Sequence, residues 1–105
     1  MILYYKVGET TKIHINRFDN TGTALDMSSG PTTVTSFLYD TDSDSIVDVI
    51  PAVYVDSAVG QYYYSPTATA LSGSKTYHLE FQEIDTNGII TWFPKGETIY
   101  LKVEG

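Results

Sequence analysis

The sequence predicts an all-β protein, an antiparallel β-sandwich of seven to nine short strands with essentially no helix. Three observations lead to this prediction. Short segments alternate between apolar and polar residues with a period of two, the pattern of a half-buried strand. Turn sequences rich in Gly, Asn, Asp and Pro separate these segments at intervals of roughly 8–12 residues. Tyrosine and β-branched residues are abundant, and no segment carries an apolar stripe of helical period.

Strands are expected in the first half of the chain at residues 2–7, 12–18, 23–27, 32–39, 46–50 and 52–55. In the second of these, Ile13 and Ile15 share one face and His14 lies on the other. Asp, Asn and Gly in segment 19–22 tolerate the backbone conformations of a tight turn. Pro51 separates the last two strands, so these strands are expected at a sheet edge or at a bulge.

The segment 32–39 carries apolar residues on both of its faces. Val34 and Leu38 alternate with Phe37 and Tyr39, so each face has apolar weight. The polar segment 56–61 then leads into a run of tyrosines, as expected where a sandwich closes.

Strands are expected in the second half at residues 62–65, 75–84, 89–93 and 98–104. The second of them has the cleanest alternation in the chain, with Tyr77, Leu79 and Phe81 on one face. The Asp-Thr-Asn-Gly sequence at 85–88 predicts a hairpin into the next strand. The residues expected to face inward from the last strand are Ile99, Leu101 and Val103.

Length and composition limit the possible functions. A chain of 105 residues predicts one domain, residues 1–105, and the absence of cysteine means that a hydrophobic core must hold it. The formal charge of −7 and the six scattered basic residues disfavour nucleic acid and anionic membranes as partners. Residues 1–5 read as a strand without a basic region or a leader-length apolar run, so synthesis in a host cytoplasm is expected.

Several local motifs occur in a recognisable order along the chain. Gly8-Glu9 precedes an alternating strand, the turn at 19–22 follows it, and Gly60 to Tyr62 enters the tyrosine run ahead of the strand 77–81 and a Gly-bearing hairpin. This layout resembles cysteine-free immunoglobulin-like modules of bacterial surface proteins and tailed-phage virion proteins. The resemblance implies an immunoglobulin-like sandwich that works as a non-enzymatic structural module. It also implies a place in a virion as a capsid decoration, head, neck or tail component.

The same resemblance implies partners and an alternative function. The expected partners are other virion proteins or further copies of the chain, in a homo-oligomer or array. Exposed strands at the two termini, residues 2–7 and 98–103, are expected to pair with a neighbouring subunit. The alternative is a cell-surface adhesion or carbohydrate-binding module.

The candidate binding residues are aromatic: Tyr54, Tyr62, Tyr64, Trp92 and Tyr100. Aromatic rings on a sheet face can stack sugars or anchor a protein partner. They can equally fill the core. The sequence leaves all three possibilities open for these residues.

Asp40, Asp42 and Asp44 alternate, and Asp48 lies nearby, which makes them candidates for a calcium site. The match to an EF-hand loop fails, because no Gly follows the third Asp and Pro51 takes the place of the final Glu. A solvated turn is the simpler interpretation, so no metal is expected.

His14 and His78 are the two histidines of the chain, and both are predicted on outward strand faces. Glu80 shares the face of His78, but a catalytic or zinc site needs further groups that converge on a histidine. The sequence has no cysteine nucleophile and no hydrolase or metalloprotease motif. We therefore expect neither an enzyme nor a cofactor.

Overall fold

The computed structural model describes residues 1–16, 33–51, 53–56, 61–67 and 69–105, with the backbone alone described at 53–56. Within these ranges the chain forms nine strands and no helix, which confirms the predicted all-β class. The strands are β1 Ile2–Lys6, β2 Ile13–Asn16, β3 Thr33–Asp40, β4 Ser45–Pro51, β5 Val53–Asp56, β6 Gln61–Tyr64, β7 Thr76–Ile84, β8 Ile90–Phe93 and β9 Ile99–Glu104. No helix long and apolar enough to span a membrane occurs in the described ranges.

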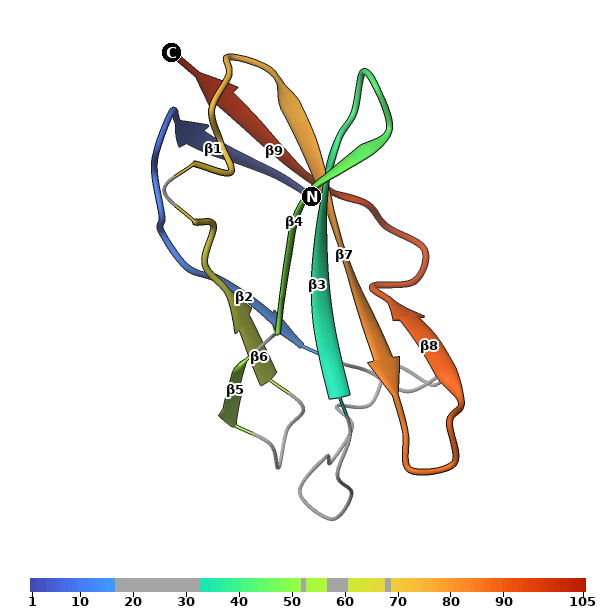
Figure 1. Ribbon diagram of the computed structural model, residues 1–105. Helices are drawn as coiled ribbons and strands as arrows, with labels where there is room; N and C mark the ends of the chain where they lie inside the picture. Colours follow the sequence, from blue (N-terminus) through green and yellow to red (C-terminus); the bar gives the residue numbers. More distant parts are fainter. Residues whose placement is uncertain (17–32, 52, 57–60, 68) are drawn as a thin grey trace.

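The strands form two sheets that pack as a sandwich (Figure 1). The larger sheet has the order β1-β9-β7-β3-β4, and β8 also pairs with β7. β8 and β9 share one edge of β7, because β9 pairs with its first half and β8 with its second. The smaller sheet has the order β2-β6-β5. The predicted sandwich is confirmed.

The alternation of the sequence is the alternation of burial in the structure. Along β7, Tyr77, Leu79 and Phe81 are buried, while His78 and Glu80 between them are half-buried on the opposite face. A strand turns successive side chains to opposite faces, so a period of two in the sequence separates a core face from an outer face. The alternation predicted for β3 and β9 is confirmed in the same way.

The core lies between the two sheets and is rich in aromatic rings. Phe93 of β8 stacks on Phe81 of β7 with ring centroids 5.3 Å apart, and Tyr62 of the smaller sheet lies 5.9 Å from Phe93. Apolar burial of this kind is the main stabilising term of a domain without disulfides. The described core residues are Tyr5, Ile13, Ile15, Val34, Leu38, Tyr62, Tyr64, Ala70, Leu71, Tyr77, Leu79, Phe81, Phe93, Ile99, Leu101 and Val103.

At one side of the sandwich the chain passes from the larger sheet to the smaller one. β4 is an edge strand that ends at Pro51, as the proline predicted, and β5 follows in the smaller sheet. The Tyr64 hydroxyl of β6 donates a hydrogen bond of 2.8 Å to Asp48 Oδ2 of β4. This bond joins the two sheets where the chain changes layer. Leu38 pairs with Asp48 and Tyr39 with Ile46, so β4 carries a bulge that bends it toward the crossing.

The predicted hairpin at 85–88 is confirmed, and Asp85 organises its turn. The Asp85 carboxylate accepts hydrogen bonds from the backbone N–H groups of Asn87 and Ile89 at 2.8 and 2.9 Å. Gly88 adopts a φ of 79°, a conformation that side chains disfavour, and its N–H donates to the Asp85 carbonyl. The turn sequence therefore fixes the register of β7 and β8.

The arrangement of the two terminal strands differs from the prediction that both are exposed edges. β1 and β9 pair with each other, and they do so in parallel, within a sheet that is otherwise antiparallel. β9 is therefore an interior strand, flanked by β1 and β7, and the prediction that segment 98–103 is an open edge is wrong. β1 is an edge strand, but Glu9 caps its end. The Lys6 N–H donates to Glu9 Oε1 and the Glu9 N–H donates to the Lys6 carbonyl, both at 3.0 Å.

Some sequence predictions lie outside the described residues. These are the turn at 19–22, the strand at 23–27 and most of the polar segment 56–61.

Candidate interaction surface

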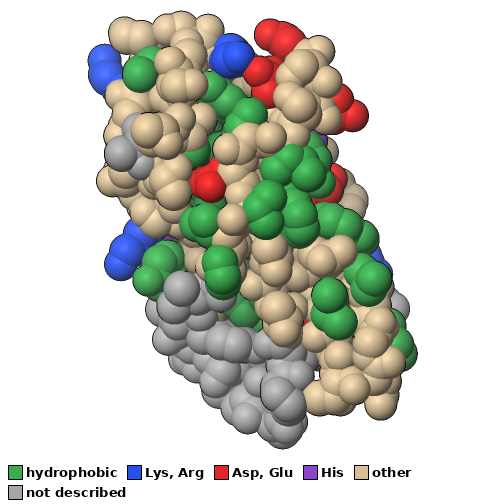
Figure 2. Space-filling view, in the orientation of Figure 1, with side chains coloured by type: hydrophobic (Ala, Val, Ile, Leu, Met, Phe, Trp, Pro, Cys, Tyr) green, Lys and Arg blue, Asp and Glu red, His purple; other side chains and the backbone are tan. Residues whose placement is uncertain are grey.

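The face of the larger sheet that points away from the smaller sheet, here called the outer face, is apolar and aromatic over most of its strands. On β1, β3, β7, β8 and β9, the residues of this face alternate with core residues of the same strand. On β4, they are the register partners of outer-face residues of β3. Figure 2 shows hydrophobic side chains gathered over β3, β4 and β8. The apolar and ring-bearing residues of the outer face include Ile2, Tyr4, Phe37, Tyr39, Ile46, Val49, His78, Ile90, Trp92 and Tyr100.

A single line of these residues crosses five strands, and we call it the cross-strand row. Ile2 of β1 is the register partner of Tyr100 of β9, which is in turn the partner of His78 of β7. His78 is the partner of Tyr39 of β3, and Tyr39 is the partner of Ile46 of β4. Register partners lie roughly 5 Å apart on one face. The row is therefore continuous from one edge of the sheet to the other.

The rings near the row pack against one another. The rings of Tyr39 and His78 are stacked, with centroids 4.6 Å apart and an interplanar angle of 16°. The centroid of the Phe37 ring lies 6.5 Å from that of Tyr39 and 5.3 Å from that of Trp92. Stacked neighbours cover each other's faces, so Tyr39 and His78 turn ring edges rather than open faces to the solvent. Mutual packing also reduces the rotamer freedom that ordering such side chains in a complex would remove.

Several apolar side chains of the outer face are exposed to solvent in the isolated molecule. The exposed fraction is 70% for Tyr4, 53% for Ile46, 50% for Val49, 40% for Trp92 and 37% for Tyr100. Single exposed apolar residues are ordinary, whereas a contiguous set of them marks an interaction surface. Here they share one face. Tyr100 lies directly beside the exposed Ile2 across strands. Ile46 and Val49 lie directly beside the rings of Tyr39 and Phe37.

Among the residues that the structure describes, few charges occur on the outer face. Lys6 and Lys102 are positive, and Glu80 and Glu104 are negative. Glu80 is half-buried directly across from Phe37. The pKa of the Tyr39 phenol is raised, first by burial and then by the negative charges of Glu80 and Asp44. The Glu80 charge is thus felt within the ring cluster.

The structure divides the predicted aromatic residues into two groups. Trp92 and Tyr100 lie on the outer face. Tyr62 and Tyr64 are 0% and 1% exposed and pack in the core, so a role for them in surface recognition is wrong. They share a face, as predicted, but the larger sheet covers that face. Tyr54 belongs to β5, and its side chain lies outside the described residues.

Sequence reasoning missed Tyr4, Phe37, Tyr39 and Ile46 as surface candidates. The signal was present for two of them, because Phe37 and Tyr39 alternate with Val34 and Leu38. An apolar residue on each face of a strand indicates that both faces are covered, either by the protein itself or by a partner.

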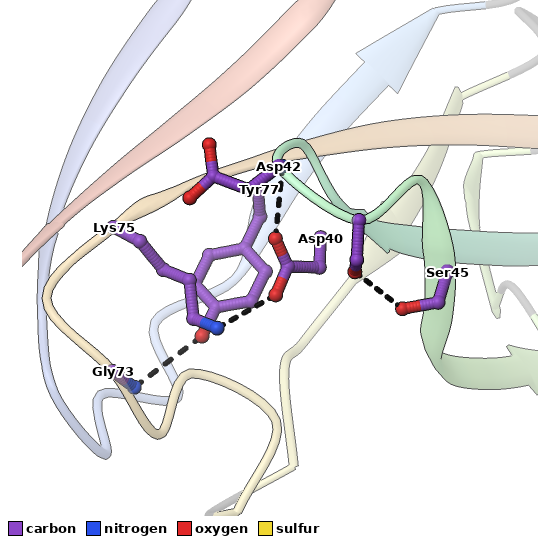
Figure 3. A network of polar contacts seen from close by, with 7 residues as sticks. Asp40, Asp42, Ser45, Gly73, Lys75 and Tyr77 are labelled. Atoms are coloured by element: carbon purple, nitrogen blue, oxygen red, sulfur yellow. Dashed lines mark hydrogen bonds and ion pairs between the residues drawn. The ribbon is translucent and has the colours of Figure 1, made fainter.

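The aspartates that were considered as a calcium site are used in the fold (Figure 3). Lys75 Nζ donates a hydrogen bond of 2.6 Å to Asp40 Oδ2, and the Asp42 N–H donates to Asp40 Oδ1 at 3.0 Å. The Lys75 hydrogen bond is the main cause that lowers the pKa of Asp40 below its usual value. Asp42 and Asp44 are exposed in the turn between β3 and β4. Asp40 thus ties the end of β3 to the segment that begins β7.

The histidines do not converge on shared partners. His14 lies on the smaller sheet, where the centroids of its ring and the Tyr63 ring are 6.3 Å apart. His78 lies on the outer face of the larger sheet and stacks on Tyr39. Within the described ranges, no group of three or more His, Asp or Glu side chains is placed to hold a metal ion.

Comparison with known proteins gives a structural match. No family model matches the sequence, and no curated protein matches it. Among solved structures, the chain is similar to CopC from Methylosinus trichosporium OB3b, with a TM-score of 0.53 and 10% sequence identity. The match covers 97% of this chain and 84% of that one. Similarity at this identity concerns the fold, and it supports the β-sandwich described above.

Proposed function

We propose that the chain is a non-enzymatic structural module that acts through protein–protein contacts. More specifically, we propose that it is an immunoglobulin-like virion protein of a tailed phage: a capsid decoration, head, neck or tail component. The observation that carries the proposal is the outer face of the larger sheet. There, apolar and aromatic side chains from every strand of that sheet lie together and remain partly exposed.

The energetics favour a protein partner for this face. Each Å² of apolar surface removed from water contributes about 25 cal/mol, so leaving a whole sheet face exposed forgoes a large stabilisation. Tyr, Trp and Phe are enriched at the centres of protein interfaces. The Phe37 ring already contacts those of Tyr39 and Trp92, so little side-chain freedom remains to be lost on binding.

The ring geometry favours a protein over a carbohydrate. A sugar stacks on an open ring face, whereas Tyr39 and His78 cover each other at 4.6 Å. A sheet face with interlocked ring edges suits packing against another apolar surface, as in sheet-on-sheet packing.

The virion assignment is tested by locating the protein. We expect reading frames beside this one to encode capsid or tail proteins, and purified particles to contain the chain at a fixed ratio to the major capsid protein, as measured by quantitative mass spectrometry. A chain that is absent from particles and exported to the cell surface would contradict the virion assignment.

The surface itself is tested by a matched pair of substitutions. Trp92→Ser should remove the chain from particles, because it removes an exposed ring from the outer face. Tyr63→Ser changes a half-buried ring on the smaller sheet, away from the outer face, and should leave incorporation unchanged. Equal incorporation of the Trp92 variant and the natural chain would show that another surface binds. Binding of both the Trp92 variant and the natural chain to a glycan array would favour the carbohydrate alternative.

A further inference from the structure

The charge of the outer face differs from that of the whole molecule. Its two lysines and two glutamates cancel, whereas the chain carries a formal charge of −7. The excess negative charge therefore lies elsewhere, and two copies of the chain repel each other through other parts of the surface. The outer face is a large apolar surface on which two copies can approach without that repulsion.

The charges are also arranged unequally about the cross-strand row. β9 and β7 are antiparallel, so Lys102 lies on one side of the row and Glu80 on the other. Lys6 and Glu104 lie beside each other on the Lys102 side, where they cancel. One side of the row is thus positive by one charge, and the other is negative by one charge.

We infer that the partner of the outer face is a second copy of this chain, packed face to face about a two-fold axis that runs along the cross-strand row. The inference rests on the proposed function, for which it names the partner. A two-fold axis along the row places each copy's row against the other's and brings the Lys102 side of one copy over the Glu80 side of the other. The same patch then serves both copies, as a two-fold interface requires.

Strand spacing brings these two charges within reach of each other. Lys102 and Glu80 each lie two residues from the row, about 7 Å along their strands, and β9 and β7 are adjacent at about 5 Å. The two-fold rotation about the row therefore leaves Lys102 of one copy offset sideways by about one strand spacing from Glu80 of the other, across the roughly 10 Å that separates packed sheets. Lys102 is exposed, and its side chain and that of Glu80 together span this separation.

The size of the face sets the expected strength. Five neighbouring strands about 5 Å apart, each contributing about five residues of 3.3 Å, give a projected area on the order of 400 Å² per copy. A standard stable interface buries roughly 800 Å² per partner. We therefore expect a dissociation constant in the micromolar range rather than the nanomolar range.

The test is sedimentation equilibrium of the purified chain from about 1 to about 500 µM, a range that brackets micromolar affinity. Glu80→Lys and Lys102→Glu should each weaken the dimer about tenfold or more, because each places like charges opposite one another. The double variant Glu80→Lys/Lys102→Glu should return to within about threefold of the natural chain. Circular dichroism and thermal melts establish that each variant is folded.

The same set of variants separates the effect of net charge from that of the two-fold arrangement. Glu80→Lys makes the chain less acidic, so general repulsion predicts a stronger dimer and the two-fold arrangement predicts a weaker one. Lys12→Glu makes the same charge change as Lys102→Glu, but from the side of the smaller sheet, where Lys12 lies over the Tyr63 ring. It should weaken the dimer by less than Lys102→Glu does.

Three outcomes decide the inference. Weakening by both single variants with recovery in the double variant supports it. A dimer that the double variant does not recover overturns the two-fold arrangement. A chain that is monomeric at every concentration overturns the second copy as partner. If that monomer is still incorporated into particles and lost from them with Trp92→Ser, the proposed function stands without the dimer.

Discussion

Two sets of tyrosines in this molecule have the same chemistry and opposite surroundings. Tyr62 and Tyr64 lie on β6 and are almost fully buried. Tyr39 and Tyr100 lie on the outer face of the larger sheet, where Tyr100 is 37% exposed. In both sets the alternation of the strand decides which residues share a face. Only the packing of one sheet on the other decides which face is covered, so an aromatic face becomes either core or exposed surface through long-range topology.

The largest test of this comparison is the removal of one ring from each set. Tyr62→Ala should lower the free energy of unfolding by about 3–5 kcal/mol, because it leaves a cavity in the core. Tyr100→Ala should lower it by less than about 1 kcal/mol, since its ring is partly in solvent. Urea denaturation at low protein concentration measures both. Similar losses for the two variants would contradict the assignment of the two faces.

This contrast also shows what the sequence could predict. The period of two in 75–84 and the turn at 85–88 are local features, and they predicted β7, its buried face and the β7–β8 hairpin. The parallel pairing of β1 with β9 joins the two ends of the chain, and no local pattern encodes it. For the same reason, Tyr62 and Tyr64 were correctly placed on one face, but the sequence did not show that this face is buried.

Alkaline pH provides a second test of the buried tyrosines. Burial, and then the charge of Glu9, raises the pKa of Tyr5 to about 12, and its hydroxyl donates to the Thr11 carbonyl at 2.8 Å. A free tyrosine has a pKa of about 10, so the unfolded chain loses this proton first. The stability from Tyr5 is therefore fully present below pH 10 and is lost as the pH rises toward 12.

Urea denaturation between pH 8 and pH 12 measures this loss. Tyr5→Phe should flatten the decline above pH 10, because the variant has no phenol to ionise at that position. An equally steep decline in Tyr5→Phe would assign the alkaline instability to other groups. Tyr64, whose pKa is also raised by burial and by Asp48, is the next candidate.

The hydrogen bond that joins the two sheets should have a smaller effect. Tyr64→Phe keeps the buried ring and removes the hydroxyl that donates to Asp48, so the half-buried carboxylate loses its partner. We expect a loss of about 1–3 kcal/mol. Tyr63→Phe, on the adjacent outward position, should change stability by less than about 0.5 kcal/mol. Thermal melts that rank the two variants in the reverse order would argue against a role for this bond.

The smallest expected effect concerns Asp40 and Lys75. The lowered pKa of Asp40 means that the stability from this pair is present above the usual carboxyl pKa and is lost as the pH falls below it. Lys75→Met should lower the melting temperature slightly at pH 7, and the difference from the natural chain should shrink as the solution is acidified below about pH 4. A difference that grows on acidification would be inconsistent with a carboxylate–ammonium pair.

The central claim is that one face of the larger sheet holds the fold together and the other binds a partner. The most direct measurement determines stability and association on the same variant, Trp92→Ser/Tyr100→Ser, at concentrations below and above dimer formation. We predict that association, measured by sedimentation equilibrium, falls at least about tenfold, while the unfolding free energy of the monomer changes by less than about 1 kcal/mol. Unchanged association together with a loss of several kcal/mol in stability would contradict the claim.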